Sequence, residues 1–254
     1  MTVGRGKIVN SVDKAIRILD ILSDAGRPLS LAELYAQLEW PKSTIHGLLS
    51  TMRANELIVQ NSRGRYWLGL RLFEYGSRVS GAWDAVESAK PIMKQVGDAL
   101  RMPVFLSAPE HGKALTLAAV RCRDCPDIYV RTGERLPIHC TAQGKLFLAH
   151  LSQAELRRLL YSEELKPYTK RTLTNPDQIP AELSRIRKYG YAAEDGEFRD
   201  GLRSVCVPIF DEAGQVVCAL GCIGKMQQAQ VLPTVDKLRK AAAQIAQTIC
   251  GKER

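Results

Sequence analysis

Apolar side chains recur at helical spacing along the first part of the chain. Hydrophobic residues three and four positions apart predict three successive helices, separated by gaps of only a few residues. The first pattern stops at a Gly-Arg-Pro run, and the second is only a few turns long. The predicted helices are residues 12–25, 30–39 and 41–55.

Residues that favour helix ends flank these stretches. Ser11 is the expected N-cap of the first helix, and Ser30 with Glu33 forms the capping-box pattern at the second. Pro41 suits the first position of the third helix, and Asn55 tolerates the left-handed conformation at its end. The local chemistry therefore agrees with the hydrophobic period.

A hairpin of two short strands follows the third helix. Strands are predicted over 57–59 and 65–68, on either side of the polar turn 61–64. Three helices followed by a hairpin with a basic tip predict a winged helix-turn-helix domain. We assign this domain to residues 8–70 and a linker helix to residues 71–82.

The rest of the chain mixes strands and helices. Apolar runs of strand length come first, then helical stretches, then a strand hairpin and a final helix. That order predicts an α+β domain with antiparallel strands and disfavours a doubly wound parallel sheet. The predicted strands are 104–107, 114–120, 128–131, 204–210 and 215–223, and the predicted helices are 86–96, 141–150, 152–161, 177–189 and 235–249.

The composition of the 254-residue chain is that of a folded globular protein, with 45% hydrophobic and 25% charged residues. The apolar runs are strand-sized and the first residues lack a signal peptide's apolar segment, so we expect a cytoplasmic protein with no membrane partner. The net charge of +9 favours anionic partners, either nucleic acid or carboxylate ligands. Residues 1–75 hold 10 Lys or Arg and 7 Asp or Glu, so DNA binding there would depend on where the charges are placed.

Sequence fragments from both halves of the chain together resemble one family. The runs SVDKA, PLSLAEL and PKSTIH are similar to the DNA-binding half of IclR-type transcriptional regulators. RYWLG resembles the wing strand of that family, and LPIHCTAQGK, GYA and GLR resemble parts of its effector domain. These fragments occupy residues 11–15, 28–34, 41–46, 65–69, 136–145, 190–192 and 201–203.

The resemblance implies a fold and a set of partners. Residues 83–254 would form a GAF-like effector-binding and oligomerisation domain, in which helices flank a sheet. The family implies a homodimer or a dimer of dimers that binds double-stranded operator DNA. It also implies control of a catabolic operon, as repressor or activator, by a small organic acid that is aromatic in some members, with contact to RNA polymerase as one route. No cofactor, metal or enzymatic activity is expected.

The start of the third predicted helix and the hairpin tip are the expected DNA-binding surface. A recognition helix presents its first turns to the major groove, where lysine and hydroxyl groups contact phosphates or base edges. Arginines at a wing tip meet phosphates or the minor groove. The alternative is a solvated helix start beside ordinary surface charge. The residues expected to contact DNA are Lys42, Ser43, Thr44, His46, Arg63 and Arg65.

Two departures from the family pattern affect this surface. Glu39 and Trp40 replace the usual Gly-Leu of the turn before the recognition helix. That turn must either hold a non-glycine residue in a costly left-handed conformation or adopt another geometry. Gly47 stands where the family usually has Arg, which removes a phosphate contact and costs the helix about 1 kcal/mol.

The passage from a strand into a helix near residue 140 is the expected effector site. His139 precedes the helix, and the backbone amides near Thr141, Ala142 and Gly144 form an anion site for a carboxylate. The alternative is a structural corner with a satisfied histidine and a buried thiol. By resemblance, Glu194, Ser204 and the strand residues near Cys222 would line the same pocket.

Three further residues bear on the ligand. Gly221 and Ile223 replace small hydroxyl residues that the family often has in its last strand, which favours an effector with an apolar or aromatic body. The planar guanidinium of Arg203 can bind a carboxylate, and an ion pair with Asp200 or Glu197 is the equal alternative.

Cys122 and Cys125 have the spacing of a redox pair, and neighbouring arginines would lower a thiol pKa. Neither a thioredoxin-like context nor a second pair at zinc-site spacing accompanies them. A loop with two free thiols is therefore the default interpretation.

Two other functions stand as alternatives. Cys140 and His139 could serve a hydrolase fused to a nucleic-acid-binding module, although adjacent strand residues point to opposite faces. Motifs of serine hydrolases, phosphate-binding loops and zinc proteases do not occur. If side chains fill the pocket, the second alternative applies: a DNA-binding or dimerisation protein that senses no ligand.

Overall fold

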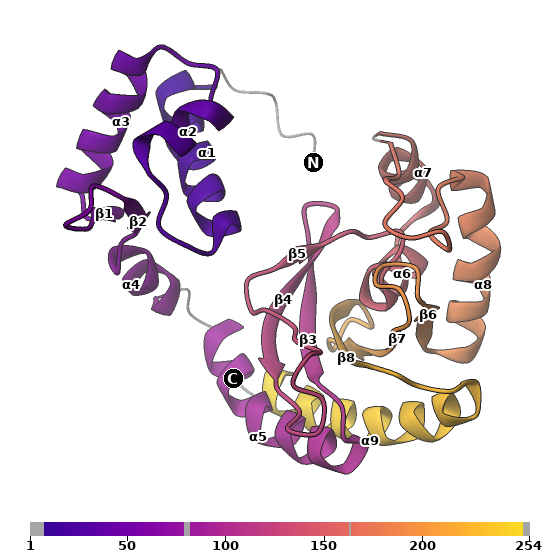
Figure 1. The fold of residues 1–254 in the computed structure, drawn as a ribbon. Coiled ribbons are helices and arrows are strands. Elements are labelled where there is room, and N and C mark those ends of the chain that lie inside the picture. The colour runs from indigo at the N-terminus through magenta and orange to yellow at the C-terminus, as the bar shows by residue number, and fades with distance from the viewer. Residues whose placement is uncertain (1–7, 79–81, 163, 251–254) are drawn as a thin grey trace. The chain divides into compact units, whose positions relative to one another are not determined.

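The computed structural model describes residues 8–78, 82–162 and 164–250 (Figure 1). The chain divides into two compact units, residues 1–80 and 81–254. Part of the linker helix predicted over 71–82 lies outside the described residues. Within the described part, α4 spans Arg71–Ser77 and α5 begins at Ala82.

The N-terminal unit contains three helices and a hairpin, as the hydrophobic period predicts. The two strands of the hairpin are antiparallel, with Val59 opposite Trp67. Ile18, Leu34 and Ile45, one from each of the first three helices, are fully buried in a common core. The elements are α1 Asn10–Ala25, α2 Leu31–Gln37, α3 Lys42–Ala54, β1 Ile58–Gln60, β2 Tyr66–Leu68 and α4.

The helix ends confirm one predicted cap and correct three. The capping box is formed, because Ser30 Oγ accepts from the Glu33 amide while Glu33 accepts from the Ser30 amide. Ser11 lies inside α1, whose N-cap is Val9, and Pro41 is the N-cap of α3 and not its first helical residue. The left-handed residue after α3 is Glu56 and not Asn55.

The turn between α2 and α3 avoids the left-handed conformation and adopts another geometry. Among the described residues, the non-glycine residues with positive φ do not include Glu39 or Trp40. The Trp40 amide donates to Leu38 O at 2.8 Å, and the Trp40 side chain packs against the core of the unit. The chain therefore replaces the glycine turn without left-handed strain.

The C-terminal unit is built on a six-stranded antiparallel sheet with the strand order β5-β4-β3-β8-β7-β6. Its strands are β3 Val104–Glu110, β4 Lys113–Val120, β5 Arg135–Leu136, β6 Ala192–Asp195, β7 Arg203–Phe210 and β8 Val216–Gly224. Its helices are α5 Ala82–Leu100, α6 Ala142–Ala149, α7 Gln153–Ser162, α8 Ile179–Tyr189 and α9 Val231–Cys250, with short 3₁₀ turns at Pro176–Gln178 and Gln228–Gln230.

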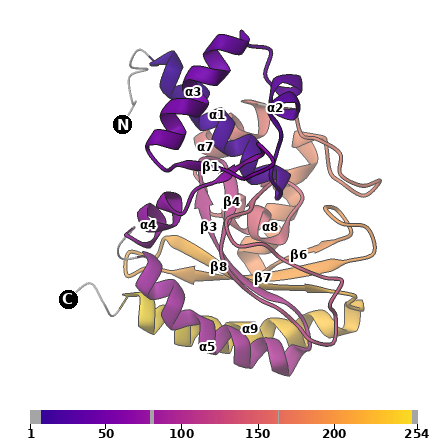
Figure 2. The ribbon, with the colours of Figure 1, turned by 60° about the vertical axis from the view of Figure 1, so that its left-hand side comes forward.

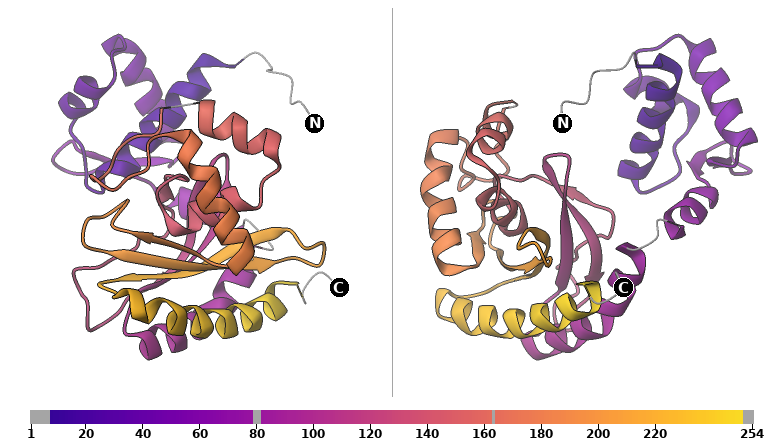
Figure 3. Two further views of the ribbon diagram at one scale, coloured as in Figure 1. Left: turned by 90° about the vertical axis from the view of Figure 1, so that its right-hand side faces the viewer. Right: turned by 180° about the vertical axis from the view of Figure 1, so that it is seen from behind.

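Helices cover both faces of this sheet. Figure 2 and Figure 3 show α5 and α9 side by side along one face, while α6 and α8 lie on the other. Successive strand residues alternate between the two cores: Val205 belongs to the α5–α9 core and Cys206 to the α6–α8 core. This GAF-like α+β arrangement is the predicted fold class.

Two details of the sheet differ from the prediction. No strand forms over 128–131; that stretch is irregular, and the edge strand comes later, at Arg135–Leu136. The other edge strand, Ala192–Asp195, was not predicted, because only two of its four residues are buried and its apolar period is short.

Candidate functional site

The outer face of α3 presents polar residues to solvent. Lys42, Ser43 and His46 are exposed, while Ile45 and Leu49 are buried against the other helices. The helical period of 3.6 residues produces this division. Thr44 is half-buried, so three of the four predicted helix residues lie fully on one solvent face.

An aromatic ring from α2 supports this face. Lys42 Nζ lies 5.7 Å from the centroid of the Tyr35 ring, and the His46 ring meets the same ring edge-on at 6.1 Å. Tyr35 itself is partly buried and packs against the core of the unit. The first turn of α3 is therefore held in place by side-chain contacts as well as by its backbone.

The hairpin tip holds its two arginines differently. Asn61 Oδ1 accepts from the amides of Arg63 and Arg65, which shapes the turn. Arg65 Nη1 reaches Pro28 O and Glu33 Oε2, both at 3.3 Å, whereas Arg63 lies exposed at the turn. The geometry thus gives Arg65 a structural contact to the capping box and leaves Arg63 at the tip.

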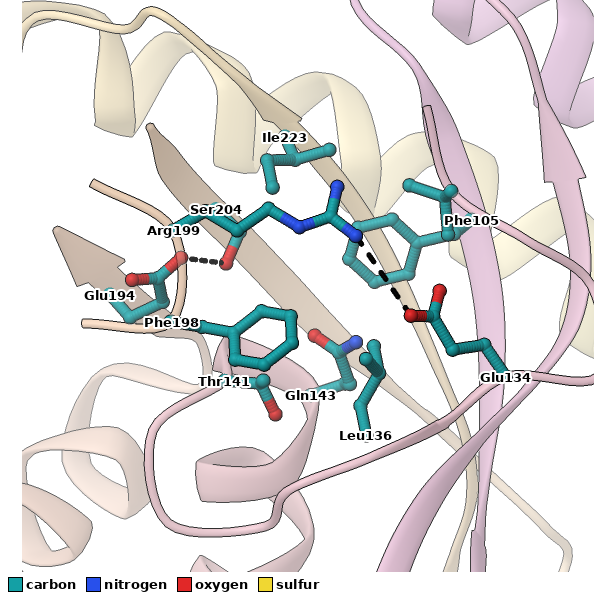
Figure 4. A pocket seen from close by; sticks show the side chains of 11 residues that line it. Phe105, Glu134, Leu136, Thr141, Gln143, Glu194, Phe198, Arg199, Ser204 and Ile223 are labelled. Carbon is teal, nitrogen blue, oxygen red and sulfur yellow. Dashed lines mark hydrogen bonds and ion pairs between the residues drawn. The ribbon is translucent and has the colours of Figure 1, made fainter. Parts of the chain in front are cut away.

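The C-terminal unit contains a narrow pocket, with about 20 Å³ of open space, between strands β3, β5, β6, β7 and β8, the start of α6 and two loops (Figure 4). Three predicted ligand residues line it: Thr141, Glu194 and Ser204. The other lining residues are Phe105, Val130, Glu134, Leu136, Gln143, Phe198, Arg199 and Ile223.

A buried hydrogen-bonding pair forms one side of this pocket. The register of β6 and β7 places Glu194 opposite Ser204, and Ser204 Oγ donates to Glu194 Oε1 at 2.8 Å. Glu194 Oε2 accepts from the Glu197 amide at 2.8 Å. Burial raises the pKa of Glu194 above its usual value, although both hydrogen bonds oppose the shift.

The N-terminus of α6 reaches the pocket through two side chains, Thr141 and Gln143. Thr141 caps the helix, because its Oγ1 accepts from the Gly144 amide at 3.2 Å. Ala142 is fully buried in the α6–α8 core and does not line the pocket. A Cβ on Gly144 would lie 2.5 Å from Ile138 Cα, so this glycine permits a close approach of the helix to the preceding segment.

Arg199, and not Arg203, is the arginine that lines the pocket. Arg203 instead contacts Asp195 Oδ2 at 2.8 Å and donates to Met226 O at 2.9 Å. Arg199 Nη1 donates to Tyr129 O at 2.8 Å, and its Nη2 lies 3.9 Å from Glu134 Oε1. Figure 4 shows the Arg199–Glu134 pair and the Glu194–Ser204 pair on opposite sides, with Phe198 between them.

Apolar side chains form the remaining walls. A Cβ on Gly221 would lie 2.7 Å from Phe105 Cζ, so the glycine leaves room for the Phe105 ring, which lines the pocket with Ile223. This arrangement agrees with the expected apolar wall. Cys222 points the other way, into the α5–α9 core, because neighbouring strand residues alternate between faces.

His139 and Cys140 lie apart from this pocket. His139 Nε2 is 3.0 Å from Lys166 O, beside a separate surface hollow that includes Tyr168, and burial lowers the pKa of its ring. Burial raises the pKa of the Cys140 thiol to about 12, which opposes the thiolate that a nucleophile needs. The geometry gives no support to a Cys/His hydrolase.

A buried charge network beside the pocket was missed by sequence reasoning. Lys145 is fully buried; its Nζ donates to both oxygens of Glu182 at 2.9 Å and to Glu197 Oε1. Burial raises the pKa of Glu197 to about 7, against the attraction of Lys145. In the sequence, Lys145 stands among apolar positions of the predicted helix. That pattern could have indicated that its side chain is buried.

The unpredicted pocket residues come mostly from loops. Glu134 and Arg199 lie in irregular segments, where no hydrophobic period places a side chain. Phe105 lies within a predicted strand. Because strand residues alternate between faces, Phe105 is expected on the face opposite to Val104 and Leu106, and this alternation could have placed it at the pocket. Within the described residues, no group of three or more His, Cys, Asp or Glu could hold a metal ion, and no helix is long and apolar enough to cross a membrane.

A winged-helix unit with an exposed polar helix, carried on one chain with a domain that encloses a pocket, defines the class of ligand-responsive DNA-binding regulators. Two family models match this chain. The model for the bacterial transcriptional regulator IclR C-terminal domain covers residues 78–250, and that for the IclR helix-turn-helix domain covers residues 11–62. The chain belongs to the IclR family of transcriptional regulators.

Individual relatives agree with this assignment. The HTH-type transcriptional regulator XynR of Escherichia coli K12 is 28% identical over 246 residues, 95% of this chain and 98% of the relative. The transcriptional repressor IclR of the same organism is 30% identical over 225 residues, 87% and 81% of the two chains. An IclR homologue from Microbacterium hydrocarbonoxydans, solved with 4-hydroxybenzoate, has a TM-score of 0.85 and 27% identity over 95% of this chain and 100% of its own. XynR and IclR are regulators, and the family matched over residues 78–250 is one of bacterial transcriptional regulators, so the chain is a transcriptional regulator and not an enzyme.

Proposed function

We propose that the pocket binds a small carboxylic acid that carries a hydroxyl group, and that the bound acid alters operator binding. The observation that carries this proposal is the chemical division of the pocket. The Arg199–Glu134 pair forms a charged side, Glu194 with Ser204 forms a hydrogen-bonding side, and aromatic and aliphatic walls lie between. A ligand with a carboxylate, an apolar body and a hydroxyl matches this division.

Each end of the pocket offers a side chain that can bind one group of such a ligand. The 3.9 Å separation of Arg199 Nη2 and Glu134 Oε1 is longer than a hydrogen bond, so a ligand carboxylate can replace Glu134 as the partner. The raised pKa of Glu194 favours a neutral hydroxyl over a second ionised group at the other end. The 4-hydroxybenzoate held by the Microbacterium hydrocarbonoxydans homologue is a ligand of this kind.

Three compounds test this assignment by thermal shift. We expect 4-hydroxybenzoate to raise the unfolding temperature, because a ligand that binds only the folded state stabilises it. Benzoate lacks the hydroxyl and 4-hydroxybenzamide lacks the charge, so both should stabilise less. Arg199→Gln should remove the preference for acid over amide, and Ser204→Ala the preference for hydroxybenzoate over benzoate. Arg157→Gln, an exposed arginine of α7, is the matched control.

The proposal fails if neither this series nor an aliphatic hydroxy acid such as gluconate stabilises the protein. Ala142→Trp is unsuitable for blocking the pocket, because Ala142 lies in the core and a large side chain would disrupt it. Gel shifts of the wild type and the Arg199→Gln variant, with and without the acid, then test whether binding changes DNA affinity.

We further propose that α3 and the hairpin tip contact operator DNA. The exposed face of Lys42, Ser43 and His46, with Thr44 at its border, suits the major groove, and Arg63 suits the phosphate backbone beside it. Arg65 would act mainly through its contact with Glu33.

Salt-dependent binding tests the two cations. Lys42→Ala and Arg63→Ala should each weaken binding to a random-sequence duplex and to the best site selected from a random library. Each should also reduce the salt slope by about one unit, since one phosphate contact is lost. Lys94→Ala, an exposed lysine of the C-terminal unit, should change neither. Unchanged binding in both variants would remove these residues from the interface.

We also infer a homodimer or dimer of dimers in the cytoplasm, acting on a catabolic operon. Exposed apolar residues of the N-terminal unit support self-association: Val12 and Ile16 of α1 are 56% and 52% exposed, and Leu70 and Phe73 are 86% and 70% exposed. A two-fold dimer would select a palindromic site. Footprinting and sedimentation test this, and transcription from the selected site would separate promoter blocking from contact with RNA polymerase.

A further inference from the structure

Two cysteines lie together in the connection between β4 and β5. The chain bends at Arg123 and Asp124, between Cys122 and Cys125, which stand three positions apart. Cys125 Sγ donates to Arg101 O at 3.6 Å, so its position is fixed against the start of β3. Neither cysteine is in a disulfide, and both are partly exposed.

This pair differs from the other cysteines that the structure describes inside the C-terminal unit. Cys140, Cys206, Cys218 and Cys222 are buried on the strands or beside α6. Such residues are inaccessible to reagents in solution. Among the six cysteines whose side chains the structure describes, Cys122 and Cys125 are therefore the two that are open to solvent.

The same connection continues into the wall of the pocket. The Ile128 amide donates to Cys125 O at 3.1 Å, which joins the cysteine turn to the next segment. Tyr129 O accepts from Arg199, and Val130 and Glu134 line the pocket. A covalent change at the cysteines therefore acts on a segment that holds one side of the pocket.

We propose that Cys122 and Cys125 are a reversible thiol-modification site, closed to a disulfide by exchange with a small organic disulfide of the oxidised glutathione type. The closed ring restrains the segment that carries Tyr129, Val130 and Glu134. A metal site is disfavoured, because two thiols lack the further ligands that zinc requires and the described residues supply no third.

The exchange is balanced in two steps. The Cys122 thiolate attacks one sulfur of the small disulfide, a mixed disulfide forms, and one small thiolate leaves and takes up a proton. Burial and the neighbouring Cys122 thiol raise the pKa of Cys125 to about 12, so Cys125 acts second: it loses its proton to solvent and attacks the Cys122 sulfur, which releases the second small thiol. Two protein thiols are oxidised, and one small disulfide is reduced to two thiols.

Peptide mass spectrometry of the full chain tests the chemistry. The protein is incubated with oxidised glutathione, its thiols are blocked at low pH, and it is digested with trypsin. Cleavage after Arg121, Arg123 and Arg131 separates the two cysteines unless a disulfide joins them. We expect a linked pair of peptides, two hydrogens lighter than their sum, that reduced glutathione reverses.

Single variants provide the control. Cys122→Ser and Cys125→Ser should give at most a glutathione adduct and no linked peptides. Recovery of only unmodified or singly glutathionylated wild-type peptides would overturn the proposal. Linkage of either cysteine to Cys140 or Cys206 would also overturn it.

Hydrogen exchange tests the structural consequence without reference to any ligand. In oxidised wild type, amides of residues 127–134 should exchange more slowly than in reduced protein, while those of α8 should not change. The double variant Cys122→Ser with Cys125→Ser should show no response to oxidant. If the amides of residues 127–134 exchange equally fast in the oxidised and reduced proteins, the disulfide does not restrain the wall of the pocket, and the proposal is wrong on this point. The outcome is independent of the ligand proposed above.

Discussion

The two recognition regions of this protein are built in opposite ways. In the N-terminal unit, the candidate DNA contacts are side chains on the solvent face of α3 and at a hairpin tip. In the C-terminal unit, several of the pocket contacts are part of the interior, although Arg199 and Glu134 are partly exposed. All ten polar or charged residues that are buried in the described chain belong to residues 81–254, and Thr141, Gln143, Glu194 and Ser204 among them line the pocket.

This difference decides what a substitution does in each region. An exposed cation that meets DNA is solvated in the free protein, so its removal changes affinity and leaves the fold stable. A buried polar group has exchanged water for protein partners, so its removal leaves those partners unsatisfied. Binding and stability are therefore separable in the N-terminal unit and coupled in the C-terminal unit.

The largest expected effect comes from Lys145. Lys145→Met keeps the length of the side chain but removes its charge, which leaves Glu182 and Glu197 without their shared partner. Breaking a buried ion pair from one side costs about 3–5 kcal/mol. Urea unfolding of the C-terminal unit should show this loss. The loss should be greater at pH 8 than at pH 5, because protonation relieves the unpaired carboxylate of Glu197.

An exposed pair supplies the matched control for Lys145. Lys94 Nζ lies 2.6 Å from Asp98 Oδ2, with both side chains 67% exposed, so Lys94→Met should cost less than about 1 kcal/mol. The double variant Lys145→Met with Glu197→Gln should recover part of the stability. Equal losses at Lys145 and Lys94 would show that burial does not distinguish the two charges.

A smaller effect is expected in the pH dependence of stability. The folded protein raises the pKa of Glu197 from 4.5 to about 7, so between these pH values the folded state holds a proton that the unfolded state has lost. The free energy of unfolding should therefore fall as pH rises through this window. The slope should not exceed about 1.4 kcal/mol per pH unit, and partial solvation reduces it.

Glu197→Gln removes this titration. The difference in unfolding free energy between wild type and the variant should change between pH 4.5 and 7 and become constant above about pH 8. A difference that is flat across the window would mean that Lys145 holds Glu197 ionised throughout. The same measurement on Asp195→Asn, an exposed carboxylate of the same region, provides the comparison.

The contrast between the regions also explains what the sequence could predict. In the N-terminal unit, helix period and the Ser30–Glu33 capping box specify local structure, and the exposed residues of α3 follow from the same period. In the pocket, Glu194 and Ser204 were expected through resemblance, and β6–β7 register brings them together. Arg199 was missed because tertiary contacts, and not local periodicity, decide which loop arginine faces inward.

The smallest expected effect concerns Gly47, in the middle of α3. A Cβ built there meets no atom within 4 Å, and the residue is exposed. Gly47→Ala should therefore raise the free energy of unfolding of the N-terminal unit by about 0.5–1 kcal/mol, because alanine loses less backbone entropy in a helix. DNA affinity should change little.

Gly47→Arg adds a cation to the same face and should steepen the salt dependence of DNA binding by about one unit, relative to Gly47→Gln, which has similar helix propensity. The salt slopes are measured by fluorescence anisotropy on a random-sequence duplex. Equal slopes for the arginine and glutamine variants would place the middle of α3 outside the DNA contact. The DNA-contacting part of α3 would then be its first turn.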